Sequence, residues 1–200
     1  MPLVSYHEHN HAAAGQAILQ RLLAGESCAL VTDAGTPAIS DPGEDLVRLC
    51  AENGVEVLSI PGCCAAVNAL AVSGLPTGRF TFEGFLTVNK KSRRERLDSL
   101  KNEERTMIFH EAPHKLRATL EDLRETFGPD RRVALCRELT KLHEETVRTT
   151  LGEAAAYTRK TPPRENTCWW WRAARPGRPP PSRWRRGRSK SCGWWPRESG

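Results

Sequence analysis

The sequence predicts an α/β protein built from two small domains. Short apolar runs suited to buried strands alternate with amphipathic patterns suited to helices, and the links between them are short. Two hundred residues suffice for one ordinary domain or two small ones. The stretch GLPTGRF, residues 74–80, interrupts the pattern with Gly and Pro, so we expect a first domain over residues 1–77 and a second over 78–164.

The first domain is predicted to contain three helices and two strands. Helices are expected at residues 13–25, 44–54 and 63–74, where glycines end the first two and small side chains make up the third. The apolar runs SCALVT (27–32) and VEVLSI (55–60) are expected to be strands of a parallel sheet with helices on both faces.

The second domain is predicted to alternate in the same way. Between its strands we expect a charged surface helix and then an amphipathic helix, whose Pro113 suits a first helical turn. The expected strands lie at 80–86, 105–112 and 131–139, the helices at 90–103 and 113–128, and a strand followed by a helix at 144–157.

Basic residues are concentrated at the carboxyl end of the chain. The net charge of +6 at first suggests a nucleic-acid-binding protein. Residues 158–200, however, carry a net charge of +10, whereas residues 1–157 carry −4. The predicted folded body is therefore mildly acidic, and its composition alone does not indicate nucleic-acid binding.

The seven cysteines indicate neither a disulfide framework nor a zinc site. No CxxC pair occurs, and Cys28, Cys50 and Cys136 lie in apolar runs typical of core residues in a reducing compartment. The alternating histidines of HEHNH (residues 7–11) lack cysteine and carboxylate partners, so we predict a polar loop and no metal. No signal peptide or membrane-spanning run is present, and we predict a cytoplasmic location.

The densest chemical signal is LVTDAGTPAISDPG, residues 30–43. A predicted strand ends at Asp33 and is followed by small residues, which let a ligand approach the backbone beyond the carboxyl end of a parallel strand. No GK[ST] follows, so this is not a phosphate-binding P-loop. The alternative is that Asp33 and Asp41 are ordinary turn residues beside Pro and Gly.

Six stretches together resemble a known family. PLVSYHEHN, LVTDAGTPAISDPG, IPGCCAAVNALAVSGLP, FTFEGFL, HEAPHKL and FGPDRRVALCRELTKLHEE follow the order and spacing of the bacterial small-subunit (16S) ribosomal RNA 2′-O-methyltransferases, which modify a cytidine. That family belongs to the tetrapyrrole methylase fold group. The resemblance covers residues 2–164 and implies two tetrapyrrole methylase-like α/β domains, S-adenosyl-L-methionine as cofactor between them, small-subunit rRNA or the 30S subunit as substrate, and a homodimer.

The resemblance also implies where the cofactor and the substrate bind. Pro61 and Gly62 are expected close to the cofactor loop, and Tyr6, His7 and Asn10 close to the substrate. The residues expected to line the cofactor cleft are Asp33, Ala34, Gly35, Thr36, Ile39 and Ser40.

Two further stretches follow predicted strands and are candidates for catalysis or RNA binding. In HEAPHKL, Glu111 and His114 would meet the ribose or cofactor, or else Glu111 caps a helix and His114 is merely exposed. In RELTKLHEE, Arg137 and Lys141 would hold phosphates and Glu138 would orient the 2′-hydroxyl, the alternative being a solvated charged turn.

A cationic helix face is the last RNA-binding candidate. The stretch KKSRRER, residues 90–96, would follow an RNA backbone or form an ordinary solvated surface. Its candidate contacts are Lys90, Lys91, Arg93 and Arg94.

Both ends of the chain depart from the family pattern. Relatives begin earlier, with a strand, a glycine-bearing turn and an acidic segment, so we expect an N-terminally truncated first domain with an unpaired strand edge. At the other end, residues 165–200 hold all six tryptophans. Reading CWWWR two bases later gives Leu-Val-Val-Glu and the start of Gly, which resembles the closing strand of relatives.

We therefore predict that residues 165–200 are an out-of-frame, disordered tail, which sequencing of the gene would test. The alternative for this tail is a basic arm whose tryptophans stack on RNA. For the whole chain, the predicted function is S-adenosylmethionine-dependent methyl transfer to the ribose of rRNA. The alternatives are methylation of a corrin-type small molecule and a non-enzymatic RNA-binding remnant.

Overall fold

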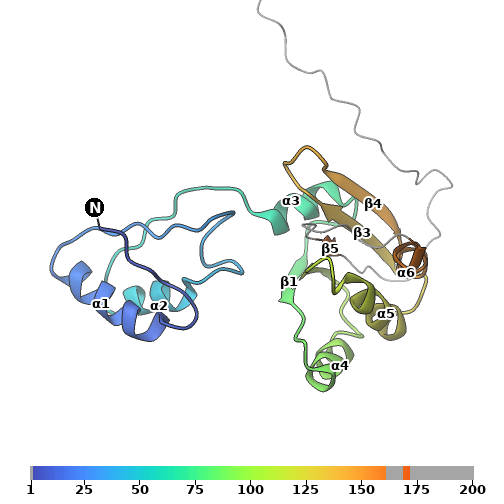
Figure 1. The fold of residues 1–200 in the computed structure, drawn as a ribbon, viewed down its shortest axis with the longest axis horizontal. Coiled ribbons are helices and arrows are strands. Elements are labelled where there is room, and N and C mark those ends of the chain that lie inside the picture. Colours follow the sequence, from blue (N-terminus) through green and yellow to red (C-terminus); the bar gives the residue numbers. More distant parts are fainter. Residues whose placement is uncertain (1, 161–168, 172–200) are drawn as a thin grey trace, which may run out of the picture. The chain divides into compact units, whose positions relative to one another are not determined.

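The chain forms two compact units, Met1–Ala65 and Ala66–Gly200. The computed structural model describes residues 2–160 and 169–171 (Figure 1). The boundary that the sequence predicts near residue 77 falls inside the second unit, because the helix that precedes it packs on the sheet of that unit. Within the described residues, no helix is both long enough and apolar enough to cross a bilayer.

The first unit is built around two packed helices, α1 (His11–Leu23) and α2 (Glu44–Glu52). Ile18 of α1 meets Leu46 and Cys50 of α2 in a small apolar core. The acidic residues Glu44 and Asp45 lie in the first turn of α2, where they interact favourably with the helix dipole.

The two strands predicted in the first unit are not formed. Residues 27–32 and 55–60 are extended but belong to no sheet within the described residues. Val31, Leu58 and Ile60 are 76%, 75% and 84% exposed, so the prediction of strands buried on both faces is wrong here. The physical reason is that a strand needs a neighbour to satisfy its backbone groups, and neither run has one.

The second unit contains a five-stranded sheet in the order β1-β2-β5-β3-β4. Its strands are β1 (Phe80–Phe85), β2 (Thr106–Glu111), β3 (Arg132–Arg137), β4 (Glu145–Thr150) and β5 (Trp169–Trp171). Its helices are α3 (Ala65–Val72), α4 (Lys90–Ser99), α5 (Leu116–Phe127) and α6 (Leu151–Lys160). Every strand and helix predicted between residues 80 and 157 is present, although α5 begins after the turn that holds Pro113.

The sheet is mixed rather than parallel. β1 and β2 are parallel, whereas β3 and β4 form an antiparallel pair and β5 lies antiparallel between β2 and β3. The backbone of Trp169–Trp171 thus fills the centre of the sheet, which corrects the prediction that these three residues belong to a disordered tail. The rest of the predicted tail lies outside the described residues.

The helices cover the two faces of this sheet unequally. Met107 and Phe109 of β2 pack in the main core with leucines of α4, α5 and α6. On the opposite face, the sulfur of Cys136 in β3 lies 3.9 Å from the carbonyl oxygen of Ala69 in α3, and Arg148 of β4 donates to the carbonyl oxygens of Val72, the last residue of α3, and Ser73. Figure 1 accordingly shows α3 beside the ends of β3 and β4.

Candidate functional site

The loop of residues 33–43 follows a left-handed path through the first unit. Gly35 and Gly43 have φ angles of +83° and +143°, and the non-glycine residues Ala38 and Ser40 have φ angles of +66° and +65°. Non-glycine residues rarely adopt this region, and such strain is typical of functional loops. Most of the side chains predicted to bind the cofactor (Asp33, Ala34, Gly35, Ile39 and Ser40) are exposed, whereas Thr36 is half-buried.

A second loop lies directly beside this one. The hydroxyl of Thr36 donates a 2.9 Å hydrogen bond to the carbonyl oxygen of Cys63. A Cβ atom on Gly35 would come within 3.8 Å of the same oxygen, and one on Gly62 within 3.9 Å of the Thr36 hydroxyl. The two loops are thus neighbours, and side chains at either glycine position would be in ordinary contact with the other loop; whether this pair of loops binds the cofactor stays a prediction.

This pair of loops could hold a flat or extended polar molecule against the backbone. It has little side-chain bulk, an exposed carboxylate at Asp33 and a backbone held in one conformation by Thr36. Amine and hydroxyl groups of a ligand would find acceptors here. No group of three or more potential metal ligands is found among the described residues.

A polar network stands next to the loop and was missed by sequence reasoning. The Tyr6 hydroxyl donates to Asp45 at 2.5 Å, and the imidazole of His11 contacts the second oxygen of the same carboxylate. Burial and the Asp45 hydrogen bond raise the pKa of Tyr6 to about 12, while the Tyr6 hydrogen bond and His11 lower the pKa of Asp45. With Ser40 and neighbouring residues, His11 and Asp45 line an open pocket.

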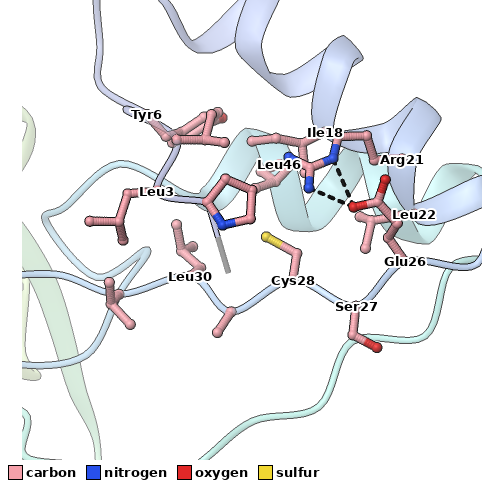
Figure 2. Close-up of a pocket in the computed structure, with 14 residues that line it drawn as sticks. Leu3, Tyr6, Ile18, Arg21, Leu22, Glu26, Ser27, Cys28, Leu30 and Leu46 are labelled. Carbon is pink, nitrogen blue, oxygen red and sulfur yellow. Dashed lines mark hydrogen bonds and ion pairs between the residues drawn. The ribbon is translucent and has the colours of Figure 1, made fainter.

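A more apolar pocket opens on the other side of Tyr6. Figure 2 shows Leu3, Leu30 and Leu46 around it, with an ion pair of Arg21 and Glu26 at its rim. It lies between the extended residues 2–4 and 26–31, above α1 and α2. The charged groups that line it, Arg21 and Glu26, are paired with each other, and the free thiol of Cys28 and the hydroxyl of Ser27 also lie in its lining.

Comparison with known proteins identifies the family. Residues 2–155 match the model of the tetrapyrrole (corrin/porphyrin) methylases. The chain belongs to this family. Proteins named ribosomal RNA small subunit methyltransferase I are similar to it: those of a Synechocystis strain and of Halalkalibacterium halodurans are 50% and 48% identical over 84% and 83% of the chain. The chain spans only 60% and 57% of those two relatives.

Solved structures of methyltransferases have the same fold as this chain. The methyltransferase CobJ superposes with a TM-score of 0.59 at 20% identity, over 86% of this chain and 74% of CobJ. A uroporphyrin-III C-methyltransferase from Thermus thermophilus, solved with S-adenosyl homocysteine, gives 0.52 at 20% identity, over 83% and 74%. The predicted tetrapyrrole methylase-like α/β fold is confirmed.

In this member of the tetrapyrrole methylase family, Glu111 is part of a buried network. Its carboxylate is 3% exposed, accepts from the Thr119 hydroxyl at 2.5 Å and from the Ala112 amide at 2.9 Å, and lies 3.8 Å from the Arg93 guanidinium. Arg93 also pairs with Asp122 at 2.6 Å. Glu111 is therefore engaged inside the fold rather than directed at a ligand, while His114 is exposed in the turn before α5.

The charged loop between β3 and β4 keeps its polar groups near the surface. Arg137 pairs with Glu145 at 2.6 Å, and Lys141 approaches Glu138 at 3.4 Å. Glu138 and Thr140 have φ angles of +51° and +66°, a second strained stretch at a strand end. Of the three residues that sequence reasoning selected here, Glu138 and Lys141 lie together in the loop, whereas Arg137 is the last residue of β3 and pairs with Glu145.

The cationic helix α4 presents only part of its predicted RNA-binding set. Lys90, Lys91 and Arg94 are exposed, but Arg93 is 8% exposed and points into the network with Glu111. The inclusion of Arg93 on this face is thus corrected, because its position on the helix turns it toward α5. Two residues that hold these polar networks together carried no local sequence signal. Thr119 donates to Glu111 and Asp45 accepts from Tyr6, and in each case the partner is distant in the sequence.

Proposed function

We propose that this methylase transfers a methyl group from S-adenosylmethionine to the ribose 2′-hydroxyl of a cytidine in small-subunit rRNA. The observation that carries the proposal is the 44–50% identity to proteins named ribosomal RNA small subunit methyltransferase I. The chain spans only 51–60% of the length of the first three of those relatives, so the activity that their names give is a proposal for this chain. The alternative, methylation of a tetrapyrrole, is supported only by the shared fold.

The paired loops would hold the cofactor. Thr36 fixes the loop of residues 33–43 against Cys63, and the bare backbone at Gly35 and Gly62 admits an adenosyl group or amino-acid moiety. Asp33 would accept from a ribose or an amine, with Ile39 and Ser40 at the border. S-adenosylmethionine supplies an activated methyl group on a sulfonium. The protein's task is to align the acceptor oxygen with that methyl group and exclude water.

The strained β3–β4 loop would receive the ribose. A hydroxyl is a weak nucleophile until its proton leaves, so a nearby base accelerates transfer. Glu138 is the described carboxylate best suited to that role, since its backbone is held in a left-handed conformation and Lys141 lies 3.4 Å away. Arg137 and Lys141 would contact phosphates, as would Lys90, Lys91 and Arg94 of α4. His114, exposed before α5, is the other candidate base.

Two further properties belong to the proposal. We expect a homodimer, as the family resemblance implies, and a cytoplasmic site of action, since the 30S subunit would be the natural substrate. Sedimentation velocity tests the first, and fractionation of cells expressing the tagged protein tests the second.

Methyl transfer tests the proposed reaction directly. The chain is titrated calorimetrically with S-adenosylmethionine and then incubated with the methyl-labelled cofactor and 30S subunits, followed by mapping of the labelled nucleotide. Label on a ribose 2′-oxygen of a cytidine is expected. Label on a corrin or porphyrin instead would favour the small-molecule alternative, and RNA binding without cofactor binding would favour the non-enzymatic remnant.

The base is tested with Glu138→Gln. This change should lower kcat by about 10²-fold or more without changing the Kd for S-adenosylmethionine. Glu125→Gln, at an exposed position of α5, is the matched control and should leave both constants unchanged. An equal kcat for the two variants would remove Glu138 from the proposal and leave the reaction itself standing.

A further inference from the structure

An aromatic surface is left uncovered at one edge of the sheet in the second unit. β1 is an edge strand, and its Phe80, Phe82 and Phe85 remain 42%, 39% and 59% exposed. Val88, just beyond the strand, is 72% exposed. Four large apolar side chains in nine residues are more than the scattered exposure that folding tolerates without consequence, and they indicate an interaction surface.

The sheet register puts these rings on the face that α3 covers only in part. Phe82 pairs with Ile108 and Phe85 with His110, so these residues point away from the main core that Met107 and Phe109 enter. The His110 ring meets Phe82 and Phe85 edge-on, with ring centroids 5.0 and 5.2 Å apart. This contact holds both phenyl rings in place and leaves part of each open to solvent.

Positive charge follows the rings a short way along the chain. Four residues separate the end of β1 from the start of α4, so the Cα atoms of Phe85 and Lys90 are at most about 18 Å apart. Lys90 and Lys91 are exposed and have no ion-pair partner among the described residues. The nearby Glu83 is already neutralised by Arg96 at 2.6 Å, so it offers little repulsion to an anion. Figure 1 shows α4 beyond the end of β1.

We propose that Phe82 and Phe85 form a stacking platform for unpaired RNA bases whose phosphates rest on Lys90 and Lys91. Every base has a π-face, and single-stranded segments expose those faces whereas duplexes hide them. A flat ring beside mobile ammonium groups matches a nucleotide better than an apolar peptide, which has no use for the charge. This platform rests on the proposed RNA substrate and names the part of the chain that recognises unpaired nucleotides.

Fluorescence anisotropy with a short single-stranded RNA containing cytidine tests the platform. Phe85→Ala should weaken binding by about 5- to 100-fold, because stacking is worth about 1–3 kcal/mol per base. Phe85→Trp should retain affinity, since it keeps a flat ring, and Phe85→Leu should lose it while keeping apolar volume. Tyr157→Leu, which replaces an aromatic on α6 whose exposure of 37% is close to the 39% of Phe82, is the control for loss of a surface ring and should bind like the wild type.

Salt dependence separates the two halves of the surface. Replacing Lys90 and Lys91 together with alanine should reduce the slope of log affinity against log salt by about 1.4, or about 0.7 for each phosphate released. Phe85→Ala should leave the slope unchanged. An RNA with an abasic sugar at the stacked position should bind the wild type and Phe85→Ala equally.

The outcomes distinguish this platform from the proposed function. If the wild type binds RNA and Phe82→Ala and Phe85→Ala bind it equally well, the platform is wrong while the RNA substrate stands. If the wild type binds no single-stranded RNA, the platform is wrong, and methyl transfer to 30S subunits alone decides the RNA-substrate proposal. If the alanine variants instead change the sedimentation coefficient without changing RNA affinity, the rings form a contact between two copies of the chain and the platform is wrong.

Discussion

The Thr36 hydroxyl donates to the Cys63 carbonyl oxygen at 2.9 Å and so joins two loops that lie 27 residues apart in the sequence. The bond fixes the spacing of the backbone that borders Gly35 and Gly62. A ligand held between the loops would therefore depend on a hydroxyl that need not touch it.

Thr36→Val removes that hydroxyl and keeps the shape of the side chain. The expected result is a weaker affinity for S-adenosylmethionine by about 2- to 12-fold, since a net hydrogen bond contributes about 0.5–1.5 kcal/mol. Titration calorimetry measures it. Thr126→Val loses a comparable hydroxyl-to-backbone bond within α5 and should not change the affinity. Equal affinities for all three proteins would contradict a role for the loop-to-loop bond.

Gly43→Ala should destabilise the first unit more than Gly25→Ala. Both glycines have positive φ angles, which cost a residue with a side chain about 1–2 kcal/mol. At Gly43 the new Cβ would also lie 2.6 Å from a methyl of Leu30 and 3.3 Å from Ala38, whereas nothing lies within 4 Å at Gly25. We expect about 2–3 kcal/mol for Gly43 and about 1 kcal/mol for Gly25.

Hydrogen exchange of the α2 amides, read by mass spectrometry, measures this difference in the first unit alone. Faster exchange in Gly43→Ala than in Gly25→Ala is the expected order. Equal acceleration would mean that the crowding at Leu30 and Ala38 relaxes freely and that only the backbone conformation matters.

Local sequence patterns predicted the second unit far better than the first. Residues 80–157 contain alternating elements whose partners are neighbours along the chain, such as β3 and β4, so periodicity and turn residues suffice. Residues 27–32 and 55–60 have strand composition, but composition cannot supply the adjacent strand that a sheet requires. The strand at Trp169–Trp171 was missed for the opposite reason, since its surroundings in sequence are typical of disorder.

The candidate site residues likewise differ in how far local sequence could predict them. Loop residues such as Gly35 and Thr36 were predicted from the family resemblance and from the small residues that follow the apolar run 27–32, and this run forms no strand, so their role in binding stays a prediction. The direction of Arg93 was not predictable from the charge pattern of its helix, because Glu111 and Thr119 reach it from other elements. Long-range polar partners of this kind leave no periodic trace in a single sequence.

Arg93→Met should destabilise the second unit by about 3–5 kcal/mol. The change leaves the Glu111 carboxylate, 3% exposed, without its buried counter-charge. The double variant Arg93→Met with Glu111→Gln removes the stranded charge and should recover part of the loss. Arg94→Met, one residue along on the exposed face, should stay within about 0.5 kcal/mol of the wild type.

Urea denaturation followed by far-ultraviolet circular dichroism measures these free energies. The informative comparison is between the single and double variants. If Glu111→Gln lowers the free energy of unfolding of the Arg93→Met variant as much as it lowers that of the wild type, the two side chains do not interact.

The imidazole of His110 makes stability depend on pH in a defined range. Burial lowers the pKa of His110 from 6.5 to about 3, so the folded protein keeps the ring neutral where the unfolded chain protonates it. The unfolded state therefore binds more protons between these values, and the free energy of unfolding falls as pH falls below about 6.5. The slope from this one group cannot exceed about 1.4 kcal/mol per pH unit.

His110→Phe removes this proton uptake, and its unfolding free energy should be flatter than that of the wild type between pH 6.5 and 5. Urea denaturation at several pH values measures both curves. The range stops at pH 5 because carboxylates contribute below it: hydrogen bonds from Arg105 lower the pKa of Glu103 from 4.5 to about 2, so that stabilisation is lost as pH falls from about 4.5 toward 2. Parallel curves for the wild type and His110→Phe would mean that the ring is protonated in the folded protein, in conflict with its position between Phe82 and Phe85.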